Sequence, residues 1–287
     1  VLGYIINETT TARNMFDLGK IDAQLDLPAN ELSTLKQRQE FSEQPILGIF
    51  YLGFNVKKPP MDNIKVRKAI SMAVDKEQIV RMLAGGQVPL AGWIPKGMAG
   101  YNENMGLKFD VEQANRLLDE AGYKDRGQFP RVVLAFNTND NHKRLAENVQ
   151  AQLKKNLGIE IELRNEEWKV YLQSLQSDPP HIFRLGWLAD IPDPDNFMSF
   201  LLSESDNNHT NWGNPQFDQL VVEAASVTDT QKRLAMYEEA QRILVEKDIP
   251  VLPIYTMVEN MMVQERVKNF PANAISQMKF KDIELTR

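Results

Sequence analysis

The sequence predicts an α/β protein whose sheet is largely parallel or mixed. Short apolar runs typical of strands alternate with helix-period segments through most of the 287 residues. Apolar residues make up 43% of the chain, which is enough for a sizeable core. Cap and stop signals, such as Asn214-Pro215 and the glycine pair at 85–86, separate the segments. The length suits one large domain or two ordinary ones.

The first half of the chain contains the clearest helix, at residues 62–83. Val66, Ile70 and Ala73 recur there at helical spacing, with charges on the opposite face. Asp110, three residues before Gln113, resembles a capping box and starts a second amphipathic helix. The other expected elements are strands at 1–7, 21–27 and 48–56, and helices at 9–18 and from Pro28 to about residue 38.

The second half continues the alternation of strands and helices. Strands are expected at 131–136, 159–163, 182–188 and 249–258. Helices are expected at 142–157 and 168–175, and from Asn214 and Thr228 onward. The strand at 182–188 is apolar except for Arg184, and Asp190 and a Pro/Asp-rich turn follow it. Such a strand is typical of one that delivers a single acid to a surface or cleft.

Composition and motifs exclude several function classes. A net charge of −6 without a long basic block argues against nucleic-acid binding. The chain has no cysteine, which excludes disulfides, cysteine nucleophiles and thiolate metal sites. Its three histidines are far apart, and no GxxxxGK[ST], GxGxxG or GxSxG motif is present. We therefore expect no metal and no cofactor.

The chain begins at Val1, without a charged and apolar leader. We therefore expect residue 1 to be an internal point of a longer parent chain.

Asp190, Asp193 and Asp195 form the one cluster from which an enzyme could be argued. Paired carboxylates can act as acid and base or bind a hard cation. Aspartate beside proline is also ordinary turn chemistry, and we favour that interpretation.

Six stretches, in order, resemble the extracellular solute-binding proteins of family 5, the peptide-binding subunits of ABC importers. They are FNVKKPPMDNIKVRKAISMAVDKEQIV at 54–80, residues 89–101, FDVEQANRLLDEAGY at 109–123, LGI through Trp168, RLGWLADIPDPDNF at 184–197 and residues 214–255. Each stretch alone is weak evidence for the resemblance, but six stretches in the same order over about two hundred residues are strong evidence. Two departures are Met61, where the family often has phenylalanine, and Gly53, where some members have an acid.

The resemblance implies a type II periplasmic-binding-protein-like fold with a ligand held between two lobes. Residues 48–255 would be the C-terminal, ligand-binding lobe. Residues 1–47 and 256–287 would belong to the first lobe, and the strands at 48–56 and 249–258 would be the hinge crossings. The implied partners are short peptides and the membrane permease subunits of an ABC importer. The implied location is periplasmic or lipid-anchored at the cell surface of a bacterium.

The resemblance also implies site residues. Asp190 matches the aspartate of the G-W-x-x-D pattern that takes the α-ammonium of a peptide. The backbone at Leu185, Gly186 and Trp187 would pair with the peptide main chain as an added strand. Arg184 and His142 match residues that meet the peptide carboxylate, and Trp168 looks like the wall of a side-chain pocket. For Arg184, His142 and Trp168, ordinary structural roles remain open.

Other functions remain open at this point. Within the same fold, the ligand could be a nickel chelate, a sugar or an opine. A carboxylate-dependent hydrolase would use the three aspartates instead. A peptide-sensing or chaperone-like relative without a transporter is a third alternative.

Overall fold

The computed structural model describes residues 1–6, 8–28 and 30–286. Its strands are β1 Ala23–Gln24, β2 Phe41–Phe54, β3 Val88–Pro89, β4 Val132–Asn137, β5 Ile161–Glu166, β6 Ile182–Leu188, β7 Val251–Val263, β8 Val267–Lys268 and β9 Glu284–Leu285. Its α-helices are α1 Thr9–Asp17, α2 Leu32–Leu35, α3 Ile64–Ala73, α4 Lys76–Leu83, α5 Val111–Glu120, α6 Asp140–Leu157, α7 Trp168–Ser177, α8 Asp195–Met198, α9 Pro215–Ser226 and α10 Thr230–Arg242. Within these described ranges, no helix is both long enough and apolar enough to cross a bilayer.

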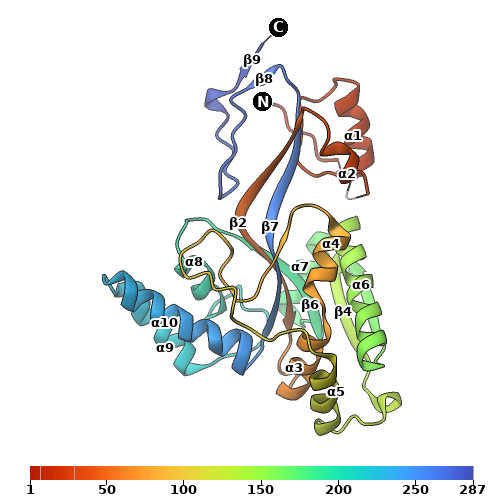
Figure 1. The fold of residues 1–287 in the computed structure, drawn as a ribbon, viewed down its shortest axis with the longest axis vertical. Coiled ribbons are helices and arrows are strands. Elements are labelled where there is room, and N and C mark those ends of the chain that lie inside the picture. The colour runs from red at the N-terminus through yellow and green to blue at the C-terminus, as the bar shows by residue number, and fades with distance from the viewer. Residues whose placement is uncertain (7, 29, 287) are drawn as a thin grey trace.

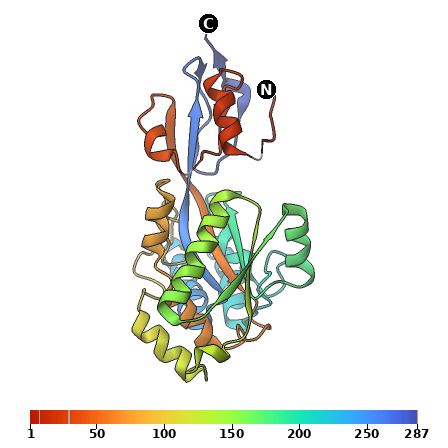
Figure 2. The same ribbon diagram turned by 90° about the vertical axis from the view of Figure 1, so that its right-hand side faces the viewer.

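The molecule has a large lower body and a small upper part, joined by the long strands β2 and β7 (Figures 1 and 2). The upper part contains α1, α2 and both chain ends. A segment of the C-terminal region returns toward the body, where the Leu47 N–H donates to Ala274 O at 2.6 Å. The two parts therefore meet along three stretches of chain.

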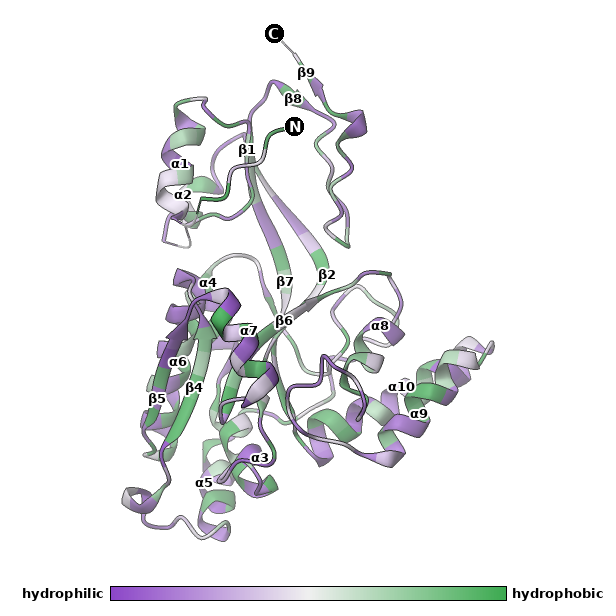
Figure 3. Ribbon diagram, turned by 180° about the vertical axis from the view of Figure 1, so that it is seen from behind, coloured by the Kyte–Doolittle hydropathy of each residue, from purple (hydrophilic) through white to green (hydrophobic). Residues whose placement is uncertain are grey.

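The main sheet has the strand order β1-β7-β2-β6-β4-β5, with β3 paired to β7. β2 pairs antiparallel with both β6 and β7, whereas β4 pairs parallel with β5 and β6. The predicted mixed sheet is confirmed. The inner strand β4 is largely hydrophobic and the edge strand β5 largely hydrophilic (Figure 3). This difference is expected because β4 is buried on both faces, whereas β5 is partly exposed.

A hydrophobic core lies on each face of this sheet. Ile49 and Tyr51 of β2 face the core that α7 to α10 cover, whereas Phe50 and Leu52 face the core under α3 to α6. Because side chains alternate along a strand, two-sided burial explains why β2 is continuously apolar through this stretch. Asn55, just beyond, is also buried.

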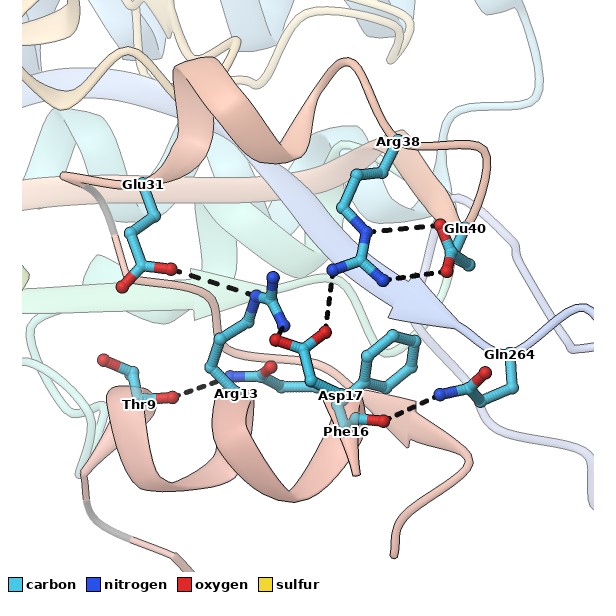
Figure 4. A network of polar contacts seen from close by, with 9 residues as sticks. Thr9, Arg13, Phe16, Asp17, Glu31, Arg38, Glu40 and Gln264 are labelled. Atoms are coloured by element: carbon cyan, nitrogen blue, oxygen red, sulfur yellow. Dashed lines mark hydrogen bonds and ion pairs between the residues drawn. The ribbon is translucent and has the colours of Figure 1, made fainter. Parts of the chain in front are cut away.

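A small third core holds the upper part together. It contains Phe16, Leu27, Leu32, Leu35 and Met262. Beside it, Asp17 accepts from Arg38 at 2.7 Å and pairs with Arg13, while Gln264 donates to the Phe16 carbonyl at 2.8 Å (Figure 4). Bonding to Arg13 lowers the pKa of the Asp17 carboxyl. The network ties α1 to the chain beyond β7.

Most predicted elements are confirmed, but the predictions for residues 1–7, 28–38 and 62–83 are wrong in whole or in part. Residues 1–6 form no strand; Val1 is 96% exposed and Ile5 99%, while residue 7 of that prediction lies outside the described residues. The predicted helix at 62–83 is two helices, because Asp75 caps α4 by accepting the Gln78 N–H at 3.0 Å. Gln152 braces the break by accepting the Asp75 N–H at 2.6 Å.

The helix that follows Pro28 is shorter than predicted, since α2 covers Leu32–Leu35; residue 29 lies outside the described residues. Asp110 accepts the Gln113 N–H at 2.9 Å, which confirms it as the cap of α5.

Arg67, the arginine of the motif at 54–80, has a structural role. It is 5% exposed, and its guanidinium donates to the carbonyls of Met61, Asp62, Asp248 and Ile249. The last two carbonyls follow the π-helical turn Ile243–Lys247 that ends α10. Arg67 therefore joins the start of α3 to the chain that enters β7.

Candidate functional site

Arg184 and His142 meet in a pocket of about 290 Å³. Arg184 lies on β6, and His142 lies in the first turn of α6, where the Asn139 side chain accepts its N–H at 3.2 Å. The guanidinium of Arg184 contacts His142 Nε2 and lies 5.0 Å from the centre of the Phe50 ring. The sequence resemblance implied that each of these residues can meet a peptide carboxylate, and the structure places them in contact.

Arg184 and His142 are both largely buried beside this pocket, which the carboxylates Asp26 and Glu259 also line. Burial lowers the pKa of Arg184 to about 10, still far above neutrality. Burial, and then the charge of Arg184, lower the pKa of His142 to about 3, so this imidazole is neutral at pH 7. Arg184 Nε is buried without a hydrogen-bond partner, and Arg184 makes no ion pair within the described residues. Such a cation favours an anionic ligand, and a guanidinium matches a carboxylate in particular.

Residues from both parts of the molecule line this pocket. Leu25, Asp26, Leu27 and Leu32 come from the upper part, whereas Leu83, Asn141, His142 and Arg184 come from the body. Phe50 and Tyr255, from β2 and β7, stack at 4.8 Å between them. Sequence reasoning missed Phe50 and Tyr255, because the pairing of β2 with β7 was not predicted residue by residue. It missed Asp26 because no local pattern indicates that the chain after β1 reaches this pocket.

Among the described residues, no strand pairs with one edge of β6 beyond Phe183. On that edge β4 pairs only with Ile182 and Phe183. The Arg184 N–H donates to the Tyr171 hydroxyl at 3.0 Å, and this hydroxyl donates to Arg184 O at 2.6 Å. The backbone groups of Arg184 therefore point away from β2. Because direction alternates along an antiparallel strand, the N–H and C=O of Gly186 also point to the free edge.

Leu185 and Trp187 direct their backbone groups the other way, toward Tyr51 and Ile49 of β2. The Ala189 N–H agrees with this alternation, since it donates to Leu47 O at 2.8 Å. Of the three residues expected to pair with a peptide main chain, Gly186 is therefore the one with unused groups at the free edge. A side chain at Gly186 would overlap Met257 and lie 3.0 Å from Ile49 O.

Trp187 and Leu185 have side chains on the opposite sheet face from Arg184. Leu185 is buried in the core, whereas the half-buried Trp187 ring lies 4.7 Å from that of Phe200. The Trp187 indole N–H donates to Asn196 Oδ1 at 3.1 Å. Only part of the Trp187 ring is therefore exposed, and Leu185 anchors β6 to the core that α7 to α10 cover.

Asp190 is exposed at the far end of β6, and its carboxylate has no hydrogen bond or ion pair among the described residues. Asp193 and Asp195 are engaged elsewhere. Arg233 donates to both carboxylate oxygens of Asp193, at 2.7 and 2.9 Å, and the Tyr237 hydroxyl donates to Asp195 at 2.9 Å. The three aspartates therefore do not act together, and Asp190 alone is free to meet a cation.

Trp168 begins α7 and is 45% exposed. Its ring lies 6.2 Å from that of Tyr171, the residue that binds the backbone of Arg184. Trp168 does not line the Arg184 pocket. The structure places it one helical turn from the residue that closes the start of the free edge.

The sequence matches the family model of the bacterial extracellular solute-binding proteins, family 5 Middle, over residues 2–209. The chain belongs to this family. It is 33% identical to the oligopeptide-binding protein OppA of Bacillus subtilis over 291 residues, covering 97% of this chain and 53% of the relative. It is 32% identical to the periplasmic oligopeptide-binding protein OppA of Escherichia coli, covering 93% and 50%. The chain thus spans about half the length of the curated relatives it matches.

Solved structures show the same fold. The oligopeptide-binding protein OppAIV of Borrelia burgdorferi superposes with a TM-score of 0.93 at 29% identity, covering 99% of this chain and 57% of that one. The OppA protein of Haemophilus influenzae, solved in complex with RPPGFSPFR, gives 0.90 at 28% identity, covering 97% and 57%. The fold is that of the type II periplasmic peptide-binding proteins, as the motifs predicted.

Proposed function

We propose that this chain forms part of the substrate-binding component of a peptide ABC importer. The observation that carries the proposal is one strand, β6, with complementary charges at its ends. Arg184, a largely buried arginine without an anionic partner among the described residues, lies near one end, and the carboxylate of Asp190, also unpaired there, follows the other. A peptide of matching polarity has a carboxylate and an ammonium to meet them.

The free edge between these ends suits a peptide main chain. An extended peptide would pair with the Gly186 N–H and C=O, in the manner of an added strand. This contact does not depend on side-chain identity, so it supports broad sequence specificity. Arg184 and Asp190 are about 20 Å apart along an extended chain. After the reach of their side chains, this span fits a peptide of roughly three to five residues.

The proposal includes the arrangement of the chain. Residues 48–255 would form the ligand-binding lobe, and residues 1–47 and 256–287 the partial first lobe. The separate small core of the upper part and the crossings of β2 and β7 support this division. The importer permease would be the membrane partner. The protein would work in the periplasm or anchored at the cell surface, as the family membership and the periplasmic relatives suggest.

The test is calorimetric titration of alanine peptides of two to five residues into the complete gene product and, in parallel, into the 287-residue chain. Each is measured as wild type, Asp190→Ala and Arg184→Met. We expect the affinity of the complete product to fall about ten- to a hundredfold on Asp190→Ala, because a charge-assisted hydrogen bond is lost. Asp206→Ala, an exposed aspartate, is the control.

The alternatives give different results in the same experiment. A carboxylate ligand without an ammonium would need Arg184 but not Asp190. A hydrolase would release free alanine during the titration, whereas the binding protein returns the peptide intact. Peptide binding that Asp190→Ala leaves unchanged would overturn the assignment of Asp190.

A further inference from the structure

Asn196 contacts two residues that we propose to face the ligand, Trp187 of β6 and Asp190 of the loop that follows. It lies in α8, and its Oδ1 accepts the indole N–H of Trp187 and the backbone N–H of Asp190, each at 3.1 Å. One side-chain oxygen therefore fixes the orientation of the Trp187 ring and the main chain that carries the Asp190 carboxylate. An isolated turn aspartate would have no such constraint.

A second layer of contacts holds Asn196 in place. Asp193, which binds Arg233 through both oxygens, also accepts the Asp195 N–H at 2.8 Å, and its carbonyl accepts the Asn196 N–H at 3.1 Å. Arg233 Nε in turn donates to the carbonyl of Ala224, near the end of α9. The loop between β6 and α8 is therefore fixed to the α9–α10 pair.

The side chain of Asn196 does not cap its own helix. Its two hydrogen bonds run back to β6 and the loop, whereas the Asp193 carboxylate accepts the N–H of Asp195, the first residue of α8. The amide is also neutral, and Arg233 keeps the pKa of the Asp193 carboxyl below its usual range. Asp190 is therefore the carboxylate of this loop that has no hydrogen bond or ion pair among the described residues.

We propose that Asn196 is a positioning residue for the ligand ammonium, which acts by holding Asp190 and Trp187 in their binding geometry. The inference rests on the proposed function, because it requires Asp190 to receive the ammonium. A preorganised carboxylate binds a cation more tightly than a mobile one, since less conformational entropy is lost on binding.

The experiment compares a free and a blocked ammonium. The alanine peptide that binds the complete gene product most tightly is titrated alongside its N-acetylated form. The quantity compared between variants is the affinity for the free peptide divided by the affinity for the acetylated one. We expect Asn196→Ala to lower this ratio about tenfold, because it removes two hydrogen bonds from the binding geometry. Asn196→Asp keeps the acceptor oxygen and should retain the wild-type ratio or raise it.

Two further variants separate the possible failures. Asn207→Ala, at an exposed asparagine, should leave the ratio unchanged. If Asp190→Ala lowers the ratio but Asn196→Ala does not, the positioning role is overturned and the proposed function stands. If Asn196→Ala weakens both peptides equally, its role is general stability and the inference is overturned. If Asp190→Ala leaves the ratio unchanged, the Asp190 anchor and the inference both fall.

Discussion

At the scale of single residues, Arg67 and Arg184 are two largely buried arginines with opposite surroundings. Arg67 donates to four backbone carbonyls, whereas the guanidinium of Arg184 meets a neutral imidazole and an aromatic ring. Burial lowers the pKa of both to about 10. The first arrangement satisfies the charge within the protein, whereas the second leaves it without an anionic partner among the described residues.

We therefore expect opposite effects from the same substitution. Arg67→Met should lower the free energy of unfolding by roughly 3 kcal/mol or more, because it leaves buried carbonyls unsatisfied. Arg184→Met should leave it unchanged or raise it by up to about 2 kcal/mol, because an unpaired buried charge is removed. Urea unfolding without ligand measures both. An equal loss in the two variants would contradict the assignment of Arg184 to a ligand.

His142 gives a pH dependence with a definite sign. Its pKa is about 3 in the folded protein, against an ordinary value of 6.5 for a solvated histidine, so below pH 6.5 the unfolded chain binds the proton first. Stability attributable to His142 is thus complete above pH 6.5 and falls toward pH 3, by up to about 1.4 kcal/mol per pH unit. Urea unfolding at about pH 7 and about pH 5, either side of the solvated value, should show a smaller loss in His142→Gln than in wild type. Equal losses would refute the buried, neutral imidazole.

Sequence and structure agree on single residues where a motif fixes the spacing. The resemblance implied that Arg184 and His142 can each meet the carboxylate of a peptide, and the structure brings the two side chains into contact. The aromatic lining of their pocket could not be predicted, because Phe50 and Tyr255 stack only through the register of β2 against β7. The role of Asn196 was equally hidden, since an asparagine after Pro-Asp is indistinguishable from turn chemistry.

At the scale of secondary structure elements, the free edge of β6 predicts a periodic effect in the ligand. If a peptide adds as a strand, the backbone N–H of every second peptide residue points toward the edge of β6 that carries the Gly186 groups. N-methylation of successive alanines should therefore weaken binding about tenfold at alternate positions and little between them. Calorimetry of the N-methyl series tests this without altering the protein. A uniform loss along the peptide would exclude strand addition.

The boundaries of elements were harder to predict than their presence. The segment 62–83 keeps its helical periodicity across Val74 and Asp75, although Asp75 is a good N-cap residue. The break depends on Gln152, which is distant in sequence and bonds both the N–H and C=O of Asp75. The prediction of a strand at the apolar start of the chain was wrong, because the pattern of apolar residues does not show whether a pairing partner exists.

At the scale of the whole molecule, the upper part should be the less stable region. Its core has few buried side chains, whereas the body has two large cores. Hydrogen exchange should be faster in α1 and α2 than in α3 and α6. Phe16→Ala should accelerate exchange in α1 and β1 while leaving α6 unchanged. Leu153→Ala, equally buried in α6, is the matched control and should affect the body.

The fold class was predictable at this scale because alternating strands and helices permit few arrangements. The sheet order was not, since β2 and β7 are neighbours although about two hundred residues separate them in sequence. Neither strand carries a local signal for the other. The motifs identified the family, and the structure then supplied the pairing.

The ladder between β2 and β7 is irregular where the two strands leave the body. Pro45 pairs with Val258 and Ile49 with Thr256, so residues 46–48 oppose Met257 alone. A two-stranded ribbon bends most easily where inter-strand hydrogen bonds are missing. Bending of the upper part against the body is therefore expected to occur at this irregularity. Leu47, in the middle of this gap, is bonded to Ala189 and Ala274 instead. The joint between the two parts is therefore most compliant at residues 46–48, beside the end of β6.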